Sequence, residues 1–66
     1  MEKKMLTTAE AAEYMNVAVG TLRWWRHVGQ GPTSFVIGMR KVMYRKEDID
    51  TWLESQYASA VGGDAA

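Results

Sequence analysis

Cysteine is absent from this 66-residue chain, which excludes disulfide bridges and a cysteine-based zinc site as sources of stability. Long apolar runs are absent too, so the sequence offers no membrane span. The N-terminal segment 1–8 passes from charged residues to two threonines without a long apolar region, and we expect no signal peptide. The sequence therefore predicts a small cytoplasmic domain whose core is built from apolar side chains alone.

Acidic residues are missing from the whole stretch between Tyr14 and Lys46. The acids lie before and after this window, so a net charge of +0 hides a positive middle between negative ends. Such segregation gives the folded chain one positive side, and nucleic acid is the commonest polyanionic partner. A solvated surface without a partner explains the charges about equally well. The window holds the only histidine, His27, and six of the eight basic residues: Arg23, Arg26, Arg40, Lys41, Arg45 and Lys46.

A capping-box pattern predicts where the first helix begins. The segment 7–10, Thr-Thr-Ala-Glu, has the S/T-x-x-E spacing in which a hydroxyl and a carboxylate satisfy free backbone N–H groups. Ala12 and Met15 continue an apolar stripe at helical spacing. We expect a helix of about two turns that begins at Thr8 and ends near Asn16, because asparagine tolerates a left-handed backbone.

A second helix is expected after a short turn, because apolar and basic side chains separate on a helical wheel. Leu22 and Trp25 share one face and are predicted to lie in the core. Arg23 and His27 lie on the opposite face. The segment 29–32, Gly-Gln-Gly-Pro, stops the helix, and its first glycine is well placed as a C-terminal cap.

From Ser34 the apolar period changes to two, which is typical of strands. Residues 35–37 and 41–44 are rich in β-branched and aromatic side chains, and residues 38–40 between them suit a turn. The pattern predicts a short hairpin with a basic tip. A hairpin of this size is unstable alone, so one face must pack against the helices.

The third helix is expected to begin at Lys46 or Glu47. Apolar residues recur at i, i+3, i+4 and i+8, and we expect Trp52 and Leu53 among them to be core residues. Residues 58–66 contain only alanine, serine, glycine and aspartate with one valine, and we expect a disordered tail. The stripe comprises Ile49, Trp52, Leu53 and Tyr57.

These elements together predict an α+β fold: a small winged helix-turn-helix with a two-stranded wing and a closing third helix, over residues 1–57. Two helices joined by a tight turn place the second helix in a DNA major groove, and a neighbouring hairpin reaches phosphates or a minor groove. The sequence contains no nucleophile–base pair, no phosphate-binding glycine motif and no metal-ligand cluster. We therefore expect neither an enzyme nor a bound cofactor or metal.

The predicted DNA contacts lie on the second helix and at the hairpin tip. A surface salt bridge with Glu13 or Glu10 is the alternative for Arg23, and a plain surface position is the alternative for His27. Trp24 either packs against the hairpin or the first helix, or lies along the DNA. The full predicted set is Val19, Gly20, Thr21, Arg23, Trp24, Arg26 and His27 on the helix, with Met39, Arg40 and Lys41 on the hairpin.

An ordered set of residues over roughly positions 5–54 resembles the small MerR-like, excisionase-type helix-turn-helix family, which includes phage excisionases. The chain length is also similar to that of the mycobacteriophage members. Two positions depart from the family pattern: Ala18 stands where serine is frequent, and Trp24 stands where a polar or basic residue is usual. The resembling residues are Leu6–Met15, Val17, Thr21, Leu22, Trp25, Gly29, Gly38, Tyr44, Arg45, Glu47–Ile49, Trp52 and Leu53.

The resemblance implies a non-enzymatic protein that binds an attachment site on double-stranded DNA and directs a phage integrase toward excision. It further implies that several copies bind side by side and bend the DNA. A small transcriptional regulator on the same fold is the main alternative. A module that uses its positive surface on an acidic protein is a third possibility.

Overall fold

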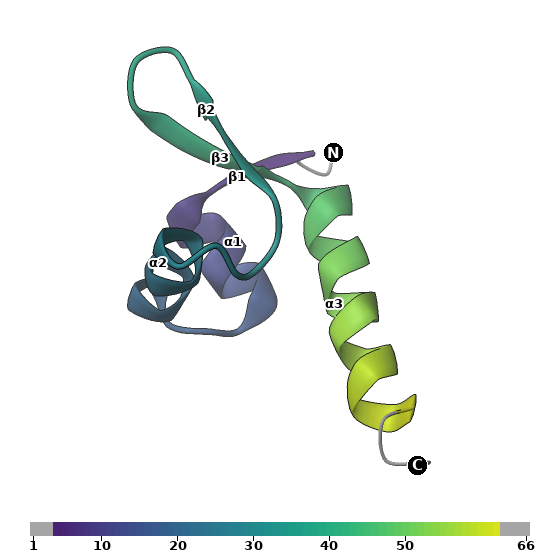
Figure 1. Ribbon diagram of the computed structural model, residues 1–66. Helices are drawn as coiled ribbons and strands as arrows, with labels where there is room; N and C mark the ends of the chain where they lie inside the picture. The colour runs from purple at the N-terminus through teal and green to yellow at the C-terminus, as the bar shows by residue number, and fades with distance from the viewer. Residues whose placement is uncertain (1–3, 63–66) are drawn as a thin grey trace.

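The computed structural model describes residues 4–62 (Figure 1). Their helices and strands form an α+β winged helix-turn-helix, as the sequence predicts. The three strands make one antiparallel sheet in the order β1-β3-β2, so that β3 lies in the centre. The elements in chain order are β1 (Met5–Thr7), α1 (Thr8–Met15), α2 (Val19–His27), β2 (Ser34–Ile37), β3 (Lys41–Arg45) and α3 (Lys46–Gly62).

The predicted two-stranded hairpin is formed by β2 and β3, and β1 adds a third strand that the sequence analysis did not predict. β1 pairs with β3 so that Leu6 lies opposite Tyr44 and Thr7 lies opposite Met43. A strand of three residues is too short to show an alternating pattern, and its pairing partner is more than 35 residues away in the chain. The pairing ties the N-terminal segment to the base of the hairpin, so the wing grows out of the domain core.

The expected capping box fixes the start of α1. The N–H of Glu10 donates to Thr7 Oγ1 at 3.2 Å, and the N–H of Thr7 donates to Glu10 Oε1 at 2.9 Å. At the other end Asn16 takes a left-handed conformation with φ 61°, and its N–H reaches the carbonyls of Ala12 and Glu13. Both predicted ends of this helix are confirmed, because the signals that set them are local.

The loop that follows α2 folds back over Trp25, and two glycines make this possible. Gly29 has φ +80° and Gly31 has φ +82°, a region that other residues rarely adopt. A Cβ on Gly29 would meet nothing within 4 Å, whereas a Cβ on Gly31 would lie 3.2 Å from the Cβ of Trp25. The close approach seats the loop against Trp25, whose ring centroid lies 5.3 Å from that of Trp52 on α3.

Gly31→Ala is therefore expected to destabilise the protein more than Gly29→Ala. Both substitutions place an alanine at positive φ, which costs about 1–2 kcal/mol. Only Gly31→Ala adds a clash with a rigid Cβ, worth about a further 1 kcal/mol. Urea unfolding of the two variants measures the difference directly, and equal losses of stability would show that the loop does not press on Trp25.

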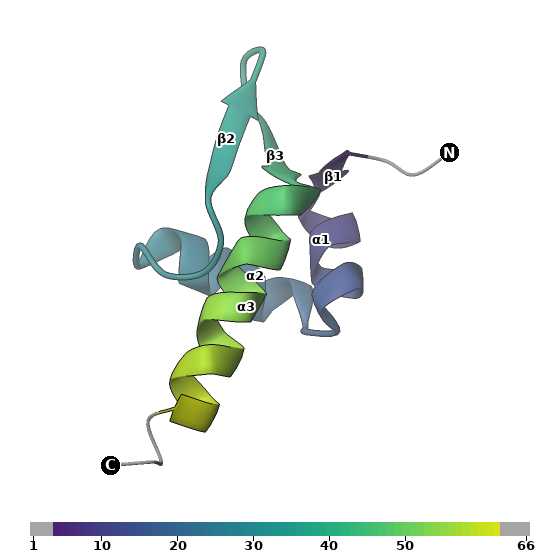
Figure 2. The ribbon, with the colours of Figure 1, turned by 90° about the vertical axis from the view of Figure 1, so that its right-hand side faces the viewer.

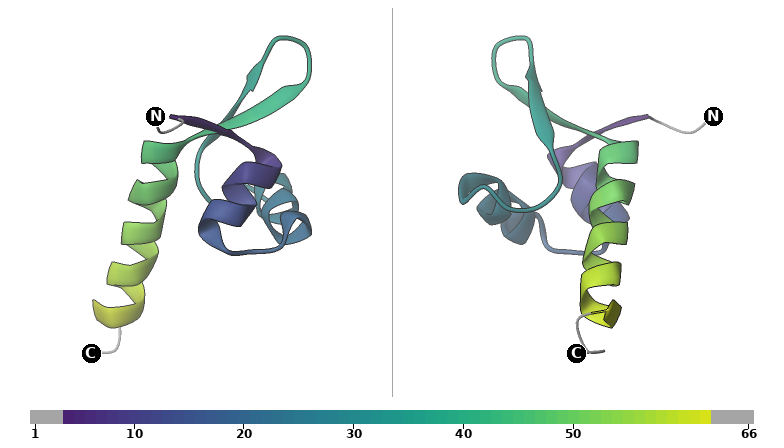
Figure 3. Two further views of the ribbon diagram at one scale, coloured as in Figure 1. Left: turned by 180° about the vertical axis from the view of Figure 1, so that it is seen from behind. Right: turned by 45° about the vertical axis from the view of Figure 1, so that its right-hand side comes forward.

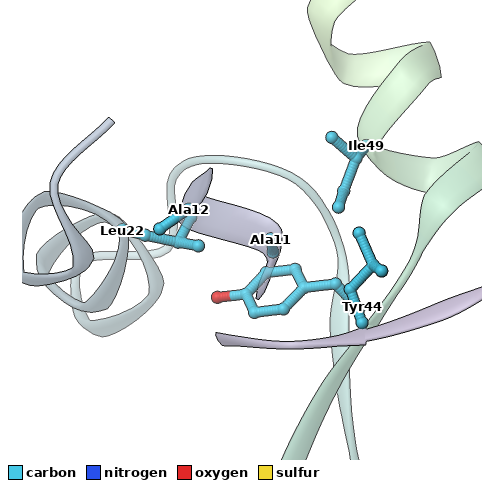
Figure 4. Close-up of a cluster of buried hydrophobic side chains, with 6 residues drawn as sticks. Ala11, Ala12, Leu22, Tyr44 and Ile49 are labelled. Atoms are coloured by element: carbon cyan, nitrogen blue, oxygen red, sulfur yellow. The ribbon is translucent and has the colours of Figure 1, made fainter. Parts of the chain in front are cut away.

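The hydrophobic core lies where the sheet meets the three helices (Figure 4). Its largest fully buried side chains are Tyr44, Leu22 and Ile49, contributed by β3, α2 and α3. Ala11 and Ala12 of α1 are also buried, and their small size lets these elements approach α1 closely. The expected core position of Leu22 is confirmed. Three other expected core residues are only half-buried: Trp25, Trp52 and Leu53.

The closing helix α3 begins at Lys46, as expected, and continues to Gly62. Residues 58–62 are therefore helical and not a disordered tail; the remainder of the expected tail, 63–66, lies outside the described residues. Alanine-rich sequence without proline favours helix, which accounts for the continuation of α3 to Gly62.

The hydroxyl of Tyr14 on α1 donates to Asp50 Oδ1 on α3 at 2.5 Å and ties the two helices together. Within residues 4–62, no helix is long and apolar enough to cross a membrane.

The arrangement separates two sides of the molecule. The hairpin tip and α2 lie to the left in Figure 1, whereas α3 runs down the right. The view from behind in Figure 3 shows the same division, with the hairpin and α2 on one side and α3 on the other. In Figure 2, where α3 faces the viewer, its last turns extend beyond α1 and α2. The hairpin and α2 are therefore free to meet a partner from the side opposite α3.

Candidate nucleic-acid interface

The outer surface of α2 is set by the burial of Leu22. On a helical wheel of about 100° per residue, Arg23 lies about 100° from Leu22, His27 about 140° and Trp24 about 160°. All three side chains are exposed, and Trp24 exposes 61% of its surface. The ring centroids of Trp24 and His27 lie 5.7 Å apart at an angle of 35°. The structure thus places Trp24 on the solvent side of α2 and not in the core.

The first turn of α2 contains three of the predicted contact residues. Gly20 and Thr21 are exposed, but Val19 is half-buried and packs against the core. The N-cap residue Ala18 forms no side-chain hydrogen bond to the helix. The backbone N–H groups of this turn therefore have no capping side chain, and Gly20 leaves open space beside the backbone.

Arg26 lies on the shoulder of α2 nearest to Tyr44. Burial raises the pKa of the Tyr44 hydroxyl above its ordinary value, and the positive charge of Arg26 partly offsets this rise. The hydroxyl points toward α2 in Figure 4 and has no hydrogen-bond partner among the described residues. The guanidinium of Arg26 is exposed, so it is close to the core without being part of it.

The tip of the hairpin presents the remaining predicted residues to solvent. Gly38 has φ +64°, which allows the tight turn between β2 and β3. Met39 exposes 94% of its surface, and Arg40 and Lys41 beside it are also exposed. A nearly fully exposed methionine between a glycine and two cations contributes little to folding.

Charge follows the division of the fold. The segment 19–41, from α2 to the hairpin tip, contains four cations and no acid: Arg23, Arg26, Arg40 and Lys41. Along α3 after its first residue there are four acids and no cation: Glu47, Asp48, Asp50 and Glu54. The positive side and the acidic helix therefore coincide with the two sides of the molecule seen in Figure 1.

Two basic residues of the acid-free window, the last of β3 and the first of α3, interact with neighbouring side chains away from α2 and the hairpin tip. Arg45 forms an ion pair with Glu47. The ammonium of Lys46 lies 5.3 Å from the ring centroid of Tyr14 on α1. By contrast, no ion pair holds Arg23 within residues 4–62, so the alternative salt bridge to Glu13 or Glu10 is not formed there. Charge sign alone does not reveal which cations are already engaged.

Sequence reasoning did not single out Val28 as a surface residue. It is 42% exposed and follows Trp24 by four positions, so the two lie on one side of α2. Its i, i+4 spacing from Trp24 is the signal in the sequence that could have identified it.

The described residues contain no candidate metal site. Along residues 4–62, no set of three or more histidine, cysteine, aspartate or glutamate side chains is placed to hold an ion.

Two comparisons with known proteins were informative in different ways. No curated protein sequence matches the chain, whereas a protein family does. Residues 5–57 match the family described as helix-turn-helix domain, a family that includes excisionase-like proteins. The matched range runs from β1 through both helices and the hairpin into α3. The chain therefore belongs to the helix-turn-helix domain family and is a sequence-specific DNA-binding protein.

Proposed function

We propose that this DNA-binding protein is an excisionase, a non-enzymatic accessory factor that directs a phage integrase toward excision. The observation that carries the proposal is the ordered motif from Leu6 to Leu53, which resembles excisionase-type proteins and falls on the paired elements of the fold. The family match is consistent with it, because the family includes excisionase-like proteins. The protein acts in the cytoplasm of the host cell, where its DNA substrate lies.

In this proposal α2 lies in the major groove. Nine helical residues at about 1.5 Å each span about 14 Å, which suits a groove about 12 Å wide. Val19 is left out of the contact set because it packs against the core. The exposed residues that face the DNA are Gly20, Thr21, Arg23, Trp24, Arg26 and His27 from α2, and Met39, Arg40 and Lys41 from the hairpin.

Backbone contacts fix the protein on the duplex. The uncapped N–H groups in the first turn of α2 donate to a DNA phosphate, in a position where the helix dipole also favours negative charge. Arg40 and Lys41 hold the neighbouring phosphates or enter the minor groove, whose negative potential favours arginine. Arg23 and His27 then face base edges.

The acidic side serves protein partners. Glu47, Asp50 and Glu54 lie on α3, opposite the positive side, and repel DNA. This leaves α3 free to meet the integrase or a neighbouring copy while α2 is bound. Several copies bound side by side bend the attachment site and bring the integrase-binding arms together.

An excision reaction reconstituted with the cognate integrase tests this function. Added protein is expected to raise the yield of excised product and to lower the yield of the integration reaction, measured on attachment-site substrates. Arg23→Ala provides the control, because it removes a proposed base contact while leaving the core intact. Bending is measured from the gel mobility of circularly permuted fragments.

A transcriptional regulator would give a different result. It would saturate a DNA site in the same buffer and leave the yields of both recombination reactions unchanged. Saturated binding without an effect on recombination would therefore contradict the excisionase function and favour the regulator.

A further inference from the structure

Trp24 is a large aromatic side chain that the fold does not use. Its exposure of 61% is high for a residue whose removal from water is strongly favourable. Val19, Leu22 and Trp25 provide apolar contacts of α2 with the rest of the protein. Trp24 makes a ring contact with His27, which is itself exposed. Stability therefore gives no reason for a tryptophan at this position.

The surroundings of Trp24 identify the kind of surface it meets. His27 and Arg23 lie to one side of it on the helical wheel, about 60° and 100° away, and the stretch between Tyr14 and Lys46 contains no acid. A positive setting of this kind favours a polyanion over an apolar protein surface. At about 160° from Leu22, Trp24 is also the side chain that points most directly away from the core among the larger residues of α2.

Thymine offers the matching chemistry. In the major groove it alone among the four unmodified bases displays an apolar group, the C5 methyl, at the base edge. An indole packed on a methyl removes apolar surface of both groups from water. The contact with His27 adds a second ring that restricts the orientation of the indole.

We propose that Trp24 determines sequence preference by packing on a thymine methyl group in the major groove. The inference rests on the docking of α2 under the proposed function and adds the base that this docking recognises. Val28, four residues further along and 42% exposed, extends the same apolar strip toward the end of α2.

Methyl deletion in the DNA tests the contact. Duplexes are first selected from a random pool by the wild-type protein, and each thymine in the recovered site is then replaced by deoxyuridine, which lacks the methyl. We expect about a fourfold loss of affinity at one or two positions, corresponding to one buried methyl each. Trp24→Ala should bind more weakly and lose this sensitivity, whereas Trp24→Phe should keep part of it.

A matched control and three outcomes make the test decisive. Tyr57→Ala removes another exposed aromatic ring, on α3, and should keep the full sensitivity to deoxyuridine. A site that tolerates every thymine replacement, with Trp24→Ala still weaker, would overturn the thymine contact alone. Unchanged single-site binding by Trp24→Ala with altered assembly of several copies would make Trp24 a protein contact. Failure of the wild-type protein to recover any duplex would overturn the proposed docking as well.

Discussion

Ile49→Ala is expected to leave a large share of the molecules unfolded. Ile49 has no exposed surface and lies at the junction of α3 with the buried Tyr44 and Ala11 (Figure 4). Truncating a buried isoleucine costs about 2–5 kcal/mol, including the cavity that remains. A domain of this size has a total stability of about 3–10 kcal/mol, so the loss approaches the whole at the lower end. Thermal and urea unfolding followed by circular dichroism measures the change.

Val61→Ala is the matched control for Ile49→Ala. Both residues are β-branched and lie on α3, but Val61 is 56% exposed on the turns that extend beyond the other helices. Its truncation should change stability by about 0.5 kcal/mol or less. Ile49→Val, which removes one methylene, should cost about 0.5–1.5 kcal/mol. A cooperative transition of Ile49→Ala close to that of the wild type would show that α3 is peripheral to the fold.

The apolar stripe of α3 shows what periodicity predicts and where it stops. The spacing correctly assigned a helix and placed Ile49, Trp52, Leu53 and Tyr57 on one side. It gave them equal weight, although Ile49 is fully buried and Tyr57 is 68% exposed. The other elements cover only the first turns of α3, so residues further along the helix are exposed. The local sequence of α3 does not indicate how far those other elements reach. Trp52, between Ile49 and Tyr57 in the chain, is half-buried.

Local signals account for the parts of the fold that were predicted well. The capping box at Thr7, the left-handed Asn16 and the glycine after α2 act within a few residues, so sequence alone places them. The pairing of β1 with β3 is nonlocal and leaves no pattern in three residues. Residues 58–62 were expected to form a disordered tail because of their composition. They are helical, and the high helix propensity of alanine, a local effect, accounts for this.

The candidate interface was predicted at the level of charge and refined by the structure. The acid-free window marked six cations, but Arg45 is engaged by Glu47 and Lys46 packs near Tyr14. Amphipathicity identified the outward face of α2, whereas the sequence left open whether Trp24 packs against the hairpin or the first helix, or lies along the DNA. Leu22 is buried and Trp24 exposes 61% of its surface, so Trp24 does not pack into the core. Which of these residues contact DNA stays a proposal.

Neutralising the hairpin tip should produce the largest change in DNA affinity. If Arg23, Arg26, Arg40 and Lys41 each neutralise one phosphate, log K against log salt has a slope of about −3 to −4. Arg40→Ala combined with Lys41→Ala should reduce this slope by about one to two units. The affinity should fall roughly ten- to fiftyfold at about 0.1 M salt, because two fewer counterions are released. Both side chains are exposed, so the unfolding transition should not move.

Loss of two positive charges anywhere weakens binding to a polyanion, so the position of the charges requires its own control. Lys4→Ala combined with Arg45→Ala removes the same net charge beside α3, where the Lys4 carbonyl accepts the N–H of Lys46. Lys4 precedes β1 and Arg45 ends β3 where α3 begins, at the end of the strand away from the hairpin tip, so their loss should change the slope by less than about half a unit. Equal slopes for the two double variants would mean that DNA senses only net charge. A change confined to the Arg40 and Lys41 variant would identify the hairpin as a second DNA contact beside α2.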